Sequence, residues 1–448
     1  MRRAAMKILL RGARVVDPAG GLTGERDLLV EGDRIAAVER DLGYVHAPAL
    51  DLAGRVVVPG LIDLHVHLRD PGLTEKEDIA SGGRSAAAGG FTSIVCMPNT
   101  DPPIDSAEVV QYVRERAAEE APVNVYVAGA ITRGLKGREL SDLESLAAAG
   151  VVLFTDDGEA VMKADLMLKA MYRAKELDVP VAPHCEDADL AGDGVMNDGP
   201  LARRLGLPGI PAVAEEVMVA RDLVLAKATG ARVHITHLST AGSLELVRAA
   251  RSQGVRVTCD VTPHHLVLTE EAVAELAANA KMYPPLRTEA DVAALRAGLR
   301  DGSIDAIATD HAPHTPAEKA RGCLEAPKGI VGLETALALC LDRLVHAGVL
   351  SLAELVRKMS VNPARIIGLP CPGIVPGAPA DFTVIDLNHR WRVDASRFAS
   401  KGRNSPFHGW ELRGKPVLTM VGGRIVYHEP NYWPEALSTV TRTAGEGW

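Results

Sequence analysis

The sequence has few cysteines, no excess of positive charge and no long hydrophobic run. Six cysteines in 448 residues, with no C-x-x-C pair, do not form a disulfide framework. A formal net charge of -9 and a pI of about 5.9 provide no basic surface for nucleic acid or an anionic membrane. No apolar run reaches membrane-spanning length. No G-x-G-x-x-G follows a predicted strand, so nothing points to a dinucleotide or a P-loop.

What is present is typical of an enzyme-sized globular protein. Hydrophobic residues make up 47% and charged residues 24% of the chain, which argues against disorder. The length suits either about three ordinary domains or one large α/β barrel with an accessory domain. Arg11 and Arg14 interrupt the first apolar stretch, which makes it a poor signal peptide and a plausible first strand. We therefore expect a cytoplasmic protein.

Both ends of the chain consist of short apolar runs separated by turn residues. KILLRGARVVDPAGG, RDLLVEGDRIAAVER and GRVVVPG predict antiparallel strands near the N-terminus. ADFTVIDL and KPVLTMVGGRIV are again rich in strand-forming residues near the C-terminus. These patterns predict one composite β-sandwich domain made of residues 1–58 and 370–448. Two unrelated small β pieces are the alternative.

The middle of the chain alternates apolar strands with helical segments. The predicted strands are LIDLHVHL, FTSIVCMPN, NVYVAGAIT, VVLFTDD, VPVAPHCE, RVHITHLS, RVTCDVTPHH and IDAIATDHAPH. Segments of helical composition lie between most of them, for example residues 160–177, 212–229 and 241–252. Strands with continuously apolar cores are typical of parallel sheets buried on both faces. Eight such units predict a (β/α)₈ barrel over residues 59–369.

Polar residues gather where these strands end, and they form a possible metal-ligand set. His65 and His67 alternate on the first strand, so both imidazoles face the same way. The other strand ends add Asp157, His184, His237 and Asp310. Nitrogen and oxygen donors of this kind suit zinc, and six are too many for one tetrahedral ion. We expect two zinc ions that share a bridging carboxylate and a bridging hydroxide. The alternative is that some of these groups only hold other side chains.

Several neighbouring residues have competing interpretations. Asp156 and Asp157 face opposite ways on their strand, so only one can enter the barrel. Asp310 opens the DHAPH run and is a candidate acid–base group that passes a proton to a leaving nitrogen. Four other imidazoles are expected to pack, form hydrogen bonds or orient neighbours, and Cys185 is expected to be a buried hydrophobe. These imidazoles are His234, His264, His265 and His311.

Three polar side chains are suited to an anionic, amide-bearing substrate. Arg69 offers a planar fork that matches a carboxylate, although a surface ion pair with Asp70 is the alternative. Asn99 can donate and accept hydrogen bonds, and His314 can donate one more. The long segment 315–332 contains prolines and glycines and is a candidate lid.

Together these motifs resemble those of the dihydroorotases of the amidohydrolase superfamily. The resemblance covers essentially the whole chain and rests on PGLIDLHVHLRDPG, FTSIVCMPNTDPPID, FTDDG, HCED, ITHLST, DVTPHHL, ATDHAPH and APKGIVGLET. It implies the reversible interconversion of N-carbamoyl-L-aspartate and L-dihydroorotate, the third step of de novo pyrimidine synthesis. It also makes a homodimer and an association with aspartate transcarbamoylase candidate assemblies, although no segment of the sequence marks such a surface.

The resemblance also implies a role for each matching residue. His65 and His67 would bind one zinc, His184 and His237 the second, and Asp157 would bridge the two. Asp310 would ligate zinc and shuttle the proton. The substrate would contact the residues at the positions of the family's binding motifs, which are His67, Arg69, Asn99, Tyr283, His314, Lys328 and Gly329.

Two positions depart from the family pattern. Tyr283 stands where the family commonly has asparagine before Pro-Pro-Leu-Arg. Lys328 stands where the family commonly has the phenylalanine of an A-P-F-G motif. Both would border the substrate, so affinity or lid closure is expected to differ.

Two other functions compete with this one. Hydantoinases, dihydropyrimidinases and allantoinases resemble one another in bridging their metals through a carboxylated lysine at the fourth strand. Here that strand ends in Phe154-Thr155-Asp156-Asp157, without a lysine. A non-catalytic scaffold would be expected to lack some ligands, and all six are present.

Overall fold

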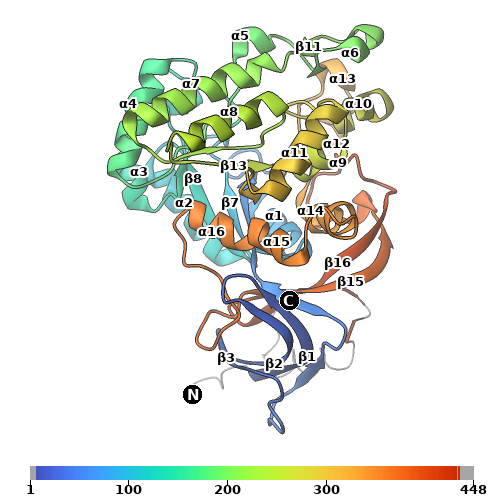
Figure 1. The fold of residues 1–448 in the computed structure, drawn as a ribbon. Helices are drawn as coiled ribbons and strands as arrows, with labels where there is room; N and C mark the ends of the chain where they lie inside the picture. The colour runs from blue at the N-terminus through green and yellow to red at the C-terminus, as the bar shows by residue number, and fades with distance from the viewer. Residues whose placement is uncertain (1–6, 431, 434–448) are drawn as a thin grey trace.

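The computed structural model describes residues 7–430, 432 and 433. The outer ends of the predicted composite domain, residues 1–6 and 434–448, lie outside the described residues, as does residue 431. Figure 1 shows two parts, a barrel ringed by helices and a β domain below it that contains both ends of the described chain. None of the helices in the described part of the chain has the length and apolarity that a membrane crossing needs.

The barrel is a ring of parallel strands. β6 (Leu61–Val66), β7 (Phe91–Cys96), β8 (Asn124–Gly129) and β9 (Leu153–Phe154) pair in that order. β12 (Val233–Ile235), β13 (Val257–Val261) and β14 (Ala306–Ile307) form a second group. Parallel bridges of Val181 to Phe154 and to Val233, and of Val66 to His311, close the ring. The predicted barrel is confirmed, with its fifth strand reduced to one bridging residue.

Helices follow most of the strands and form the outer layer, as Figure 1 shows for α4, α7 and α8. The longer ones are α1 (Ile79–Ala88), α2 (Ala107–Glu120), α3 (Leu143–Ala149), α4 (Ala164–Glu176), α7 (Val213–Thr229), α8 (Ala241–Ser252), α11 (Glu289–Asp301) and α14 (Leu333–Cys340). The shorter ones are α5 (Ala188–Ala191), α6 (Pro200–Leu205), α9 (Pro263–Val267), α10 (Glu271–Leu276), α12 (Pro316–Lys319), α13 (Gly322–Glu325), α15 (Leu352–Val356) and α16 (Asn362–Ile366). A short pair, β10 (Met196–Asn197) with β11 (Gly209–Ile210), lies among them.

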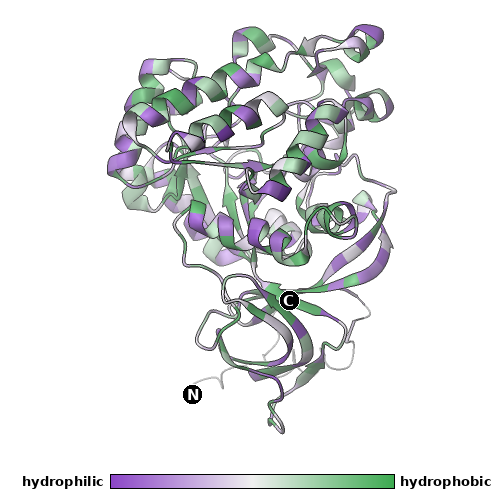
Figure 2. Cartoon of the chain, in the orientation of Figure 1, coloured by the Kyte–Doolittle hydropathy of each residue, from purple (hydrophilic) through white to green (hydrophobic). Residues whose placement is uncertain are grey.

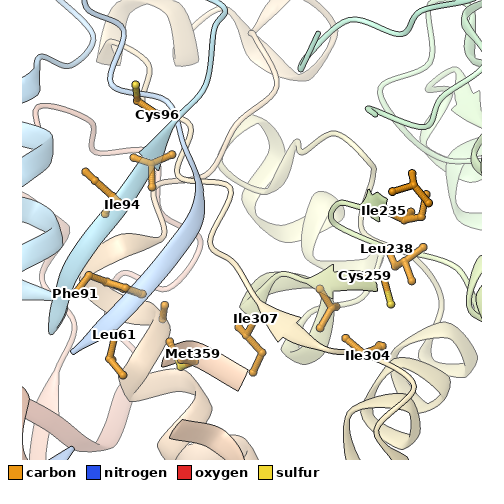
Figure 3. Close-up of a cluster of buried hydrophobic side chains, with 14 of the residues drawn as sticks. Leu61, Phe91, Ile94, Cys96, Ile235, Leu238, Cys259, Ile304, Ile307 and Met359 are labelled. Atoms are coloured by element: carbon orange, nitrogen blue, oxygen red, sulfur yellow. The ribbon is translucent and has the colours of Figure 1, made fainter. Parts of the chain in front are cut away.

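The main hydrophobic core lies between the barrel strands and these helices. Figure 2 shows apolar strands inside and mixed or polar helix surfaces outside. Figure 3 shows part of this core, where Met359 lies between Leu61 and Ile307. Burial of such side chains stabilises each by about 1.5–3 kcal/mol relative to exposure. The core therefore fixes the strands on which the polar strand ends are mounted.

The β domain is one hydrogen-bonded sheet made from both ends of the chain. Its order is β17 (Arg424–His428), β16 (Glu411–Val421), β15 (Phe382–Arg392), β5 (Val56–Pro59), β1 (Lys7–Asp17), β2 (Leu22–Glu31) and β3 (Arg34–Glu39), with β4 (Ala49–Asp51) paired to β1. β5 joins the two ends because it pairs with β1 on one side and antiparallel with β15 on the other. The alternative of two unrelated β pieces is therefore wrong, and the sheet encloses its own apolar cluster. The domain boundaries near residues 58 and 370 stay a prediction.

Candidate metal centre

Asp157 lies at the centre of the predicted ligand set, just past the end of β9. Its Oδ2 atom is 3.1 Å from His65 Nε2 and 3.4 Å from His67 Nε2. Its Oδ1 atom is 3.2 Å from His184 Nδ1 and 3.1 Å from His237 Nε2. Each carboxylate oxygen therefore faces a different pair of imidazoles, which is the arrangement needed for a bridging ligand.

Asp310 completes the cluster on the side of the first histidine pair. Its Oδ1 atom lies 3.1 Å from His67 Nε2 and 3.6 Å from His65 Nε2. Burial alone would raise the pKa of Asp310, but the facing imidazoles lower this pKa below its usual range. The same balance holds the pKa of Asp157 well below normal, with the charge of His65 as the main opposing cause. Both carboxylates are therefore ionised and available as ligands.

The donor set fits metal ions. Three overlapping groups each have their ligand atoms within 4.8 Å of one another, and their members are His65, His67 and Asp157, then Asp157, His184 and His237, then His65, His237 and Asp310. His184 Nδ1 and His237 Nε2 lie 3.2 Å apart, and two ring nitrogens this close need a proton or a cation between them. Buried His65 Nε2 has no hydrogen bond among the described residues. Imidazole and carboxylate donors of this kind are typical zinc ligands.

Buried carboxylates and an amide hold the histidines in place from behind. His67 Nδ1–H donates to Asn99 Oδ1 at 2.7 Å, which turns Nε2 towards the cluster. Asp63 accepts the backbone N–H of His65 at 3.1 Å and of Thr309 at 3.0 Å, and its complete burial raises its pKa to about 7. A further buried carboxylate, at position 260 on β13, accepts the backbone N–H of His237 at 2.7 Å.

Three of the site residues have a left-handed backbone. Arg69 has φ 60°, His237 has φ 39° and Asp310 has φ 48°. Non-glycine residues rarely adopt this conformation because the Cβ atom crowds the backbone. Such conformations persist where the surrounding structure imposes them, and they cluster at functional sites. Each of these residues lies two or three residues beyond the end of a barrel strand, so the chain changes direction where these side chains are mounted.

Arg69 is buried beside the cluster without an acidic partner. Its Nε donates a long hydrogen bond of 3.4 Å to Pro313 O, and among the described residues it forms no ion pair. Burial lowers its pKa to about 10, so it stays charged at neutral pH. The alternative ion pair with Asp70 is not formed, since that carboxylate accepts from Tyr112 Oη at 3.1 Å. With Asn99 Oδ1 occupied by His67, the amide Nδ2 of Asn99 is left to donate.

The segment 315–332 is tied down by its own contacts. His314 Nε2–H donates to Lys328 O at 2.8 Å, and burial lowers the pKa of His314 to about 3, so its ring is neutral. Lys319 Nζ donates to Pro327 O at 3.0 Å and to Gly329 O at 3.1 Å. Any side chain at Gly329 would clash, since a Cβ there would lie 2.5 Å from a backbone oxygen and 2.8 Å from the His314 ring. The neutral His314 has committed its only N–H, so its free Nδ1 can only accept.

Tyr283 and Lys328, the two departures from the family pattern, contact each other. The Lys328 ammonium lies 3.1 Å from the centre of the Tyr283 ring, and that ring lies 5.3 Å from the His184 ring. Burial lowers the pKa of Lys328 to about 8. The pair therefore places an aromatic face and a cation at the edge of the metal-ligand cluster.

The residues with competing interpretations lie around the cluster. Asp156 bonds Thr132, accepting its N–H at 2.9 Å and its hydroxyl. His311 Nε2 lies 3.2 Å from Glu77 Oε2. Cys185 is buried and its Sγ lies 3.7 Å from a buried aspartate on α7. The remaining imidazoles contact hydroxyl, carboxylate, carbonyl or ring groups, and they are His234, His264 and His265.

Sequence reasoning missed several residues that support the site. They are Asp63, Glu77, Asp260 and Asn404. Asp63 lies two residues before His65 on β6, and Asp260 lies on β13, the strand next to the one that precedes His237. The sequence pattern predicts only a core position for both residues. An acid inside an otherwise apolar strand is a signal that could have found both. No pattern in the sequence marks Asn404, which lies between β15 and β16.

Comparisons with known proteins identify the family of this chain. A family model described as dihydro-orotase-like matches residues 54–243. A dihydroorotase of Syntrophus aciditrophicus is 51% identical over 426 residues, covering 95% of this chain and 100% of that protein. A dihydroorotase of Pelotomaculum thermopropionicum is 52% identical over 424 residues, covering 95% and 99%.

Solved structures show the same architecture. An L-hydantoinase (dihydropyrimidinase) from Arthrobacter aurescens superposes with a TM-score of 0.85 at 27% identity, covering 95% of this chain and 97% of that one. A dihydropyrimidinase from Brevibacillus agri shares the fold with a TM-score of 0.84 at 23% identity. The α/β barrel with a β domain built from both chain ends is thus common to these structures and this chain. The near full-length identity to dihydroorotases goes further, and this chain is a cyclic amidohydrolase that belongs to the dihydroorotase family.

Proposed function

We propose that this enzyme interconverts L-dihydroorotate and N-carbamoyl-L-aspartate, with water consumed on ring opening, at two zinc ions. This reaction is the third step of de novo pyrimidine synthesis. The observation that carries the choice of substrate is the buried Arg69 guanidinium, which lies beside the metal-ligand cluster and has no acidic partner among residues 7–430, 432 and 433. A buried guanidinium needs an anion, and dihydroorotate brings a carboxylate to the ring that the cluster would open.

The metal site of this proposal uses the six clustered side chains. His65 and His67 would hold one zinc, His184 and His237 the other, and Asp157 would bridge them through its two oxygens. When bound, the ions would polarise the amide carbonyl and lower the pKa of the attacking water.

Substrate orientation depends on Arg69 and Asn99. The terminal nitrogens of Arg69 and the Nδ2 of Asn99 would donate to the ring carboxylate, because Nε and Oδ1 are already committed to Pro313 O and His67. Tyr283, Lys328, His314 and Gly329 would border the ring on the side of segment 315–332. A hydrogen bond from the neutral His314 to the substrate requires that Nε2–H release Lys328 O.

Asp310 would carry the proton. Its ionised carboxylate can accept a proton from the attacking water and deliver it to the ring nitrogen as the C–N bond breaks. In the reverse direction the same carboxylate removes a proton from the carbamoyl nitrogen as the ring closes. Among the described residues, only Asp310 and Asp157 have a carboxylate oxygen within 4 Å of a ring nitrogen of the first histidine pair, and both oxygens of Asp157 are directed at imidazoles.

A comparison of charged and neutral rings tests this function. The zinc-loaded enzyme should hydrolyse L-dihydroorotate and cyclise N-carbamoyl-L-aspartate, and it should not act on dihydrouracil. Arg69→Met removes the guanidinium and should lower kcat/KM for dihydroorotate at least about thirtyfold. This factor follows because the loss of a buried charged hydrogen bond costs about 2–5 kcal/mol.

Arg84→Met, at an exposed position on α1, is the matched control and should leave turnover unchanged. Equal turnover of dihydrouracil and dihydroorotate would instead indicate a dihydropyrimidinase. The homodimer and the association with aspartate transcarbamoylase stay predictions.

A further inference from the structure

Asn404 reaches from the connection between β15 and β16 into the substrate side of the barrel. Its Oδ1 accepts the backbone N–H of His314 at 3.1 Å. Its Nδ2 donates to Ala312 O and to Gly329 O, both at 2.9 Å. The side chain is buried, and its acceptor and both donor directions are used. One amide therefore ties together two chain segments that both border the proposed substrate.

The bond to His314 also acts on Arg69. The N–H that Asn404 accepts and the carbonyl that receives Arg69 Nε belong to the same peptide unit, between Pro313 and His314. In a trans peptide these two groups point in opposite directions. Holding the N–H towards Asn404 therefore directs the Pro313 carbonyl towards Arg69. The Nε contact in turn orients the guanidinium, and its terminal nitrogens make no hydrogen bond within the described part of the chain.

Tight packing fixes the segment that carries Asn404. A Cβ at Gly402 would lie 2.6 Å from Val331 Cγ1 and 2.8 Å from Pro313 Cβ, so no side chain fits there. The backbone of Asn404 also accepts the Val331 N–H at 3.0 Å. Residues 402–404 thus pack between Pro313 and Val331. A shift of either Pro313 or Val331 would disturb these three residues.

We propose that Asn404 is a positioning residue for carboxylate recognition, acting on the substrate through the Pro313–His314 peptide and Arg69. The inference rests on the proposed function for its substrate, and it adds that the C-terminal part of the chain sets the selectivity of the barrel. Asparagine is required because aspartate would turn an oxygen towards the carbonyl oxygens of Ala312 and Gly329. Alanine would remove the partner of the His314 N–H and of the Ala312 carbonyl, and would leave Gly329 O with Lys319 alone.

A double-mutant cycle with Arg69 tests the proposal. Asn404→Ala should lower kcat/KM for dihydroorotate about fivefold to 150-fold, mainly through KM, because buried polar groups lose their partners. In the Arg69→Met background the same substitution should change kcat/KM less than threefold, since its route to the substrate is already lost. A general structural role would give the same factor in both backgrounds, and that result would overturn the proposal.

Two further variants separate positioning from misfolding. Asn404→Asp keeps an acceptor for the His314 N–H and should retain slow hydrogen exchange at the amides of Ala312 and His314, while exchange at residues 328–331 rises. Asn388→Ala, at an exposed position on β15, is the matched control and should change neither exchange nor kcat/KM.

The exchange measurement needs no substrate, so it stands even if dihydroorotate proves not to be the substrate. Absence of turnover in the wild-type enzyme would refute the proposed function alone. Wild-type exchange at both segments in Asn404→Ala would refute the role of Asn404 alone.

Discussion

The Lys328 ammonium lies over the face of the Tyr283 ring, 3.1 Å from its centre. Both residues stand at positions where the resemblance predicts other side chains, and this contact joins them. A lysine at position 328 would face no ring if residue 283 were the asparagine common in the family. A cation held over an aromatic face is stabilised by about 0.5–2 kcal/mol, more where it is desolvated.

We expect the two side chains to be energetically coupled. Lys328→Met and Tyr283→Leu should each destabilise the protein in urea unfolding. The double variant should lose less than the sum of the two, by about 0.5–2 kcal/mol. Tyr283→Phe keeps the ring and should retain the coupling to Lys328. Strict additivity would show that the contact contributes nothing.

Asp157 should be required for both metal ions. Asp157→Ala removes the carboxylate whose two oxygens face separate histidine pairs, so metal analysis should find both zinc ions lost or weakly held. Asp156→Ala is the matched control, because the Asp156 carboxylate accepts a hydrogen bond from Thr132 and does not face the histidines. This variant should leave the metal content unchanged. Two tightly held zinc ions in Asp157→Ala would mean that another group bridges them.

Metal binding should release protons. Burial would lower the pKa of His65, but Asp157 and Asp310 raise it to about 10, so the metal-free site holds a proton there at neutral pH. A zinc ligand must be deprotonated, and zinc affinity should therefore rise with pH until about pH 10. Titration calorimetry of the metal-free enzyme in buffers of different ionisation enthalpy should show proton release at pH 8. A binding heat that is independent of the buffer would contradict this charge assignment.

Asp310 should control the rates in both directions. Asp310→Asn keeps the size of the side chain but cannot carry a proton, so both rates should fall at least about 10²-fold while some metal remains bound. Ring opening creates a carboxylate and releases a proton, and cyclisation consumes one. In the wild-type enzyme, ring opening should therefore improve as pH rises and cyclisation as pH falls. Near-normal rates in Asp310→Asn would exclude this residue as the proton carrier.

The sequence predicts those parts of the molecule that depend on local pattern. Apolar runs and turn residues place the barrel strands, and the alternation of His65 and His67 places two imidazoles on one face. The fifth strand is overpredicted, because its apolar composition is that of a strand while only Val181 forms a bridge. The pairing of β5 with β15 joins the two ends of the chain. It can be expected only when the β-rich patterns of both ends are considered together, because neither end alone indicates it.

The contacts that complete the site depend on tertiary distances, which no local pattern encodes. Asn404 lies 90 residues beyond His314 in sequence and in a connection without a periodic pattern. The contact between Lys328 and Tyr283 likewise depends on how segment 315–332 folds back over the barrel. Resemblance identifies such positions as departures, but only the structure shows that the two side chains meet.

The left-handed backbone at Arg69, His237 and Asp310 has a consequence for adaptation to heat. Glycine would relax each of these positions, since a left-handed conformation costs an ordinary residue about 1–2 kcal/mol. In the metal-free protein, selection for thermal tolerance alone would therefore favour chains that have lost the guanidinium, the imidazole or the carboxylate at these three positions. These three side chains persist against that bias only while turnover itself is selected.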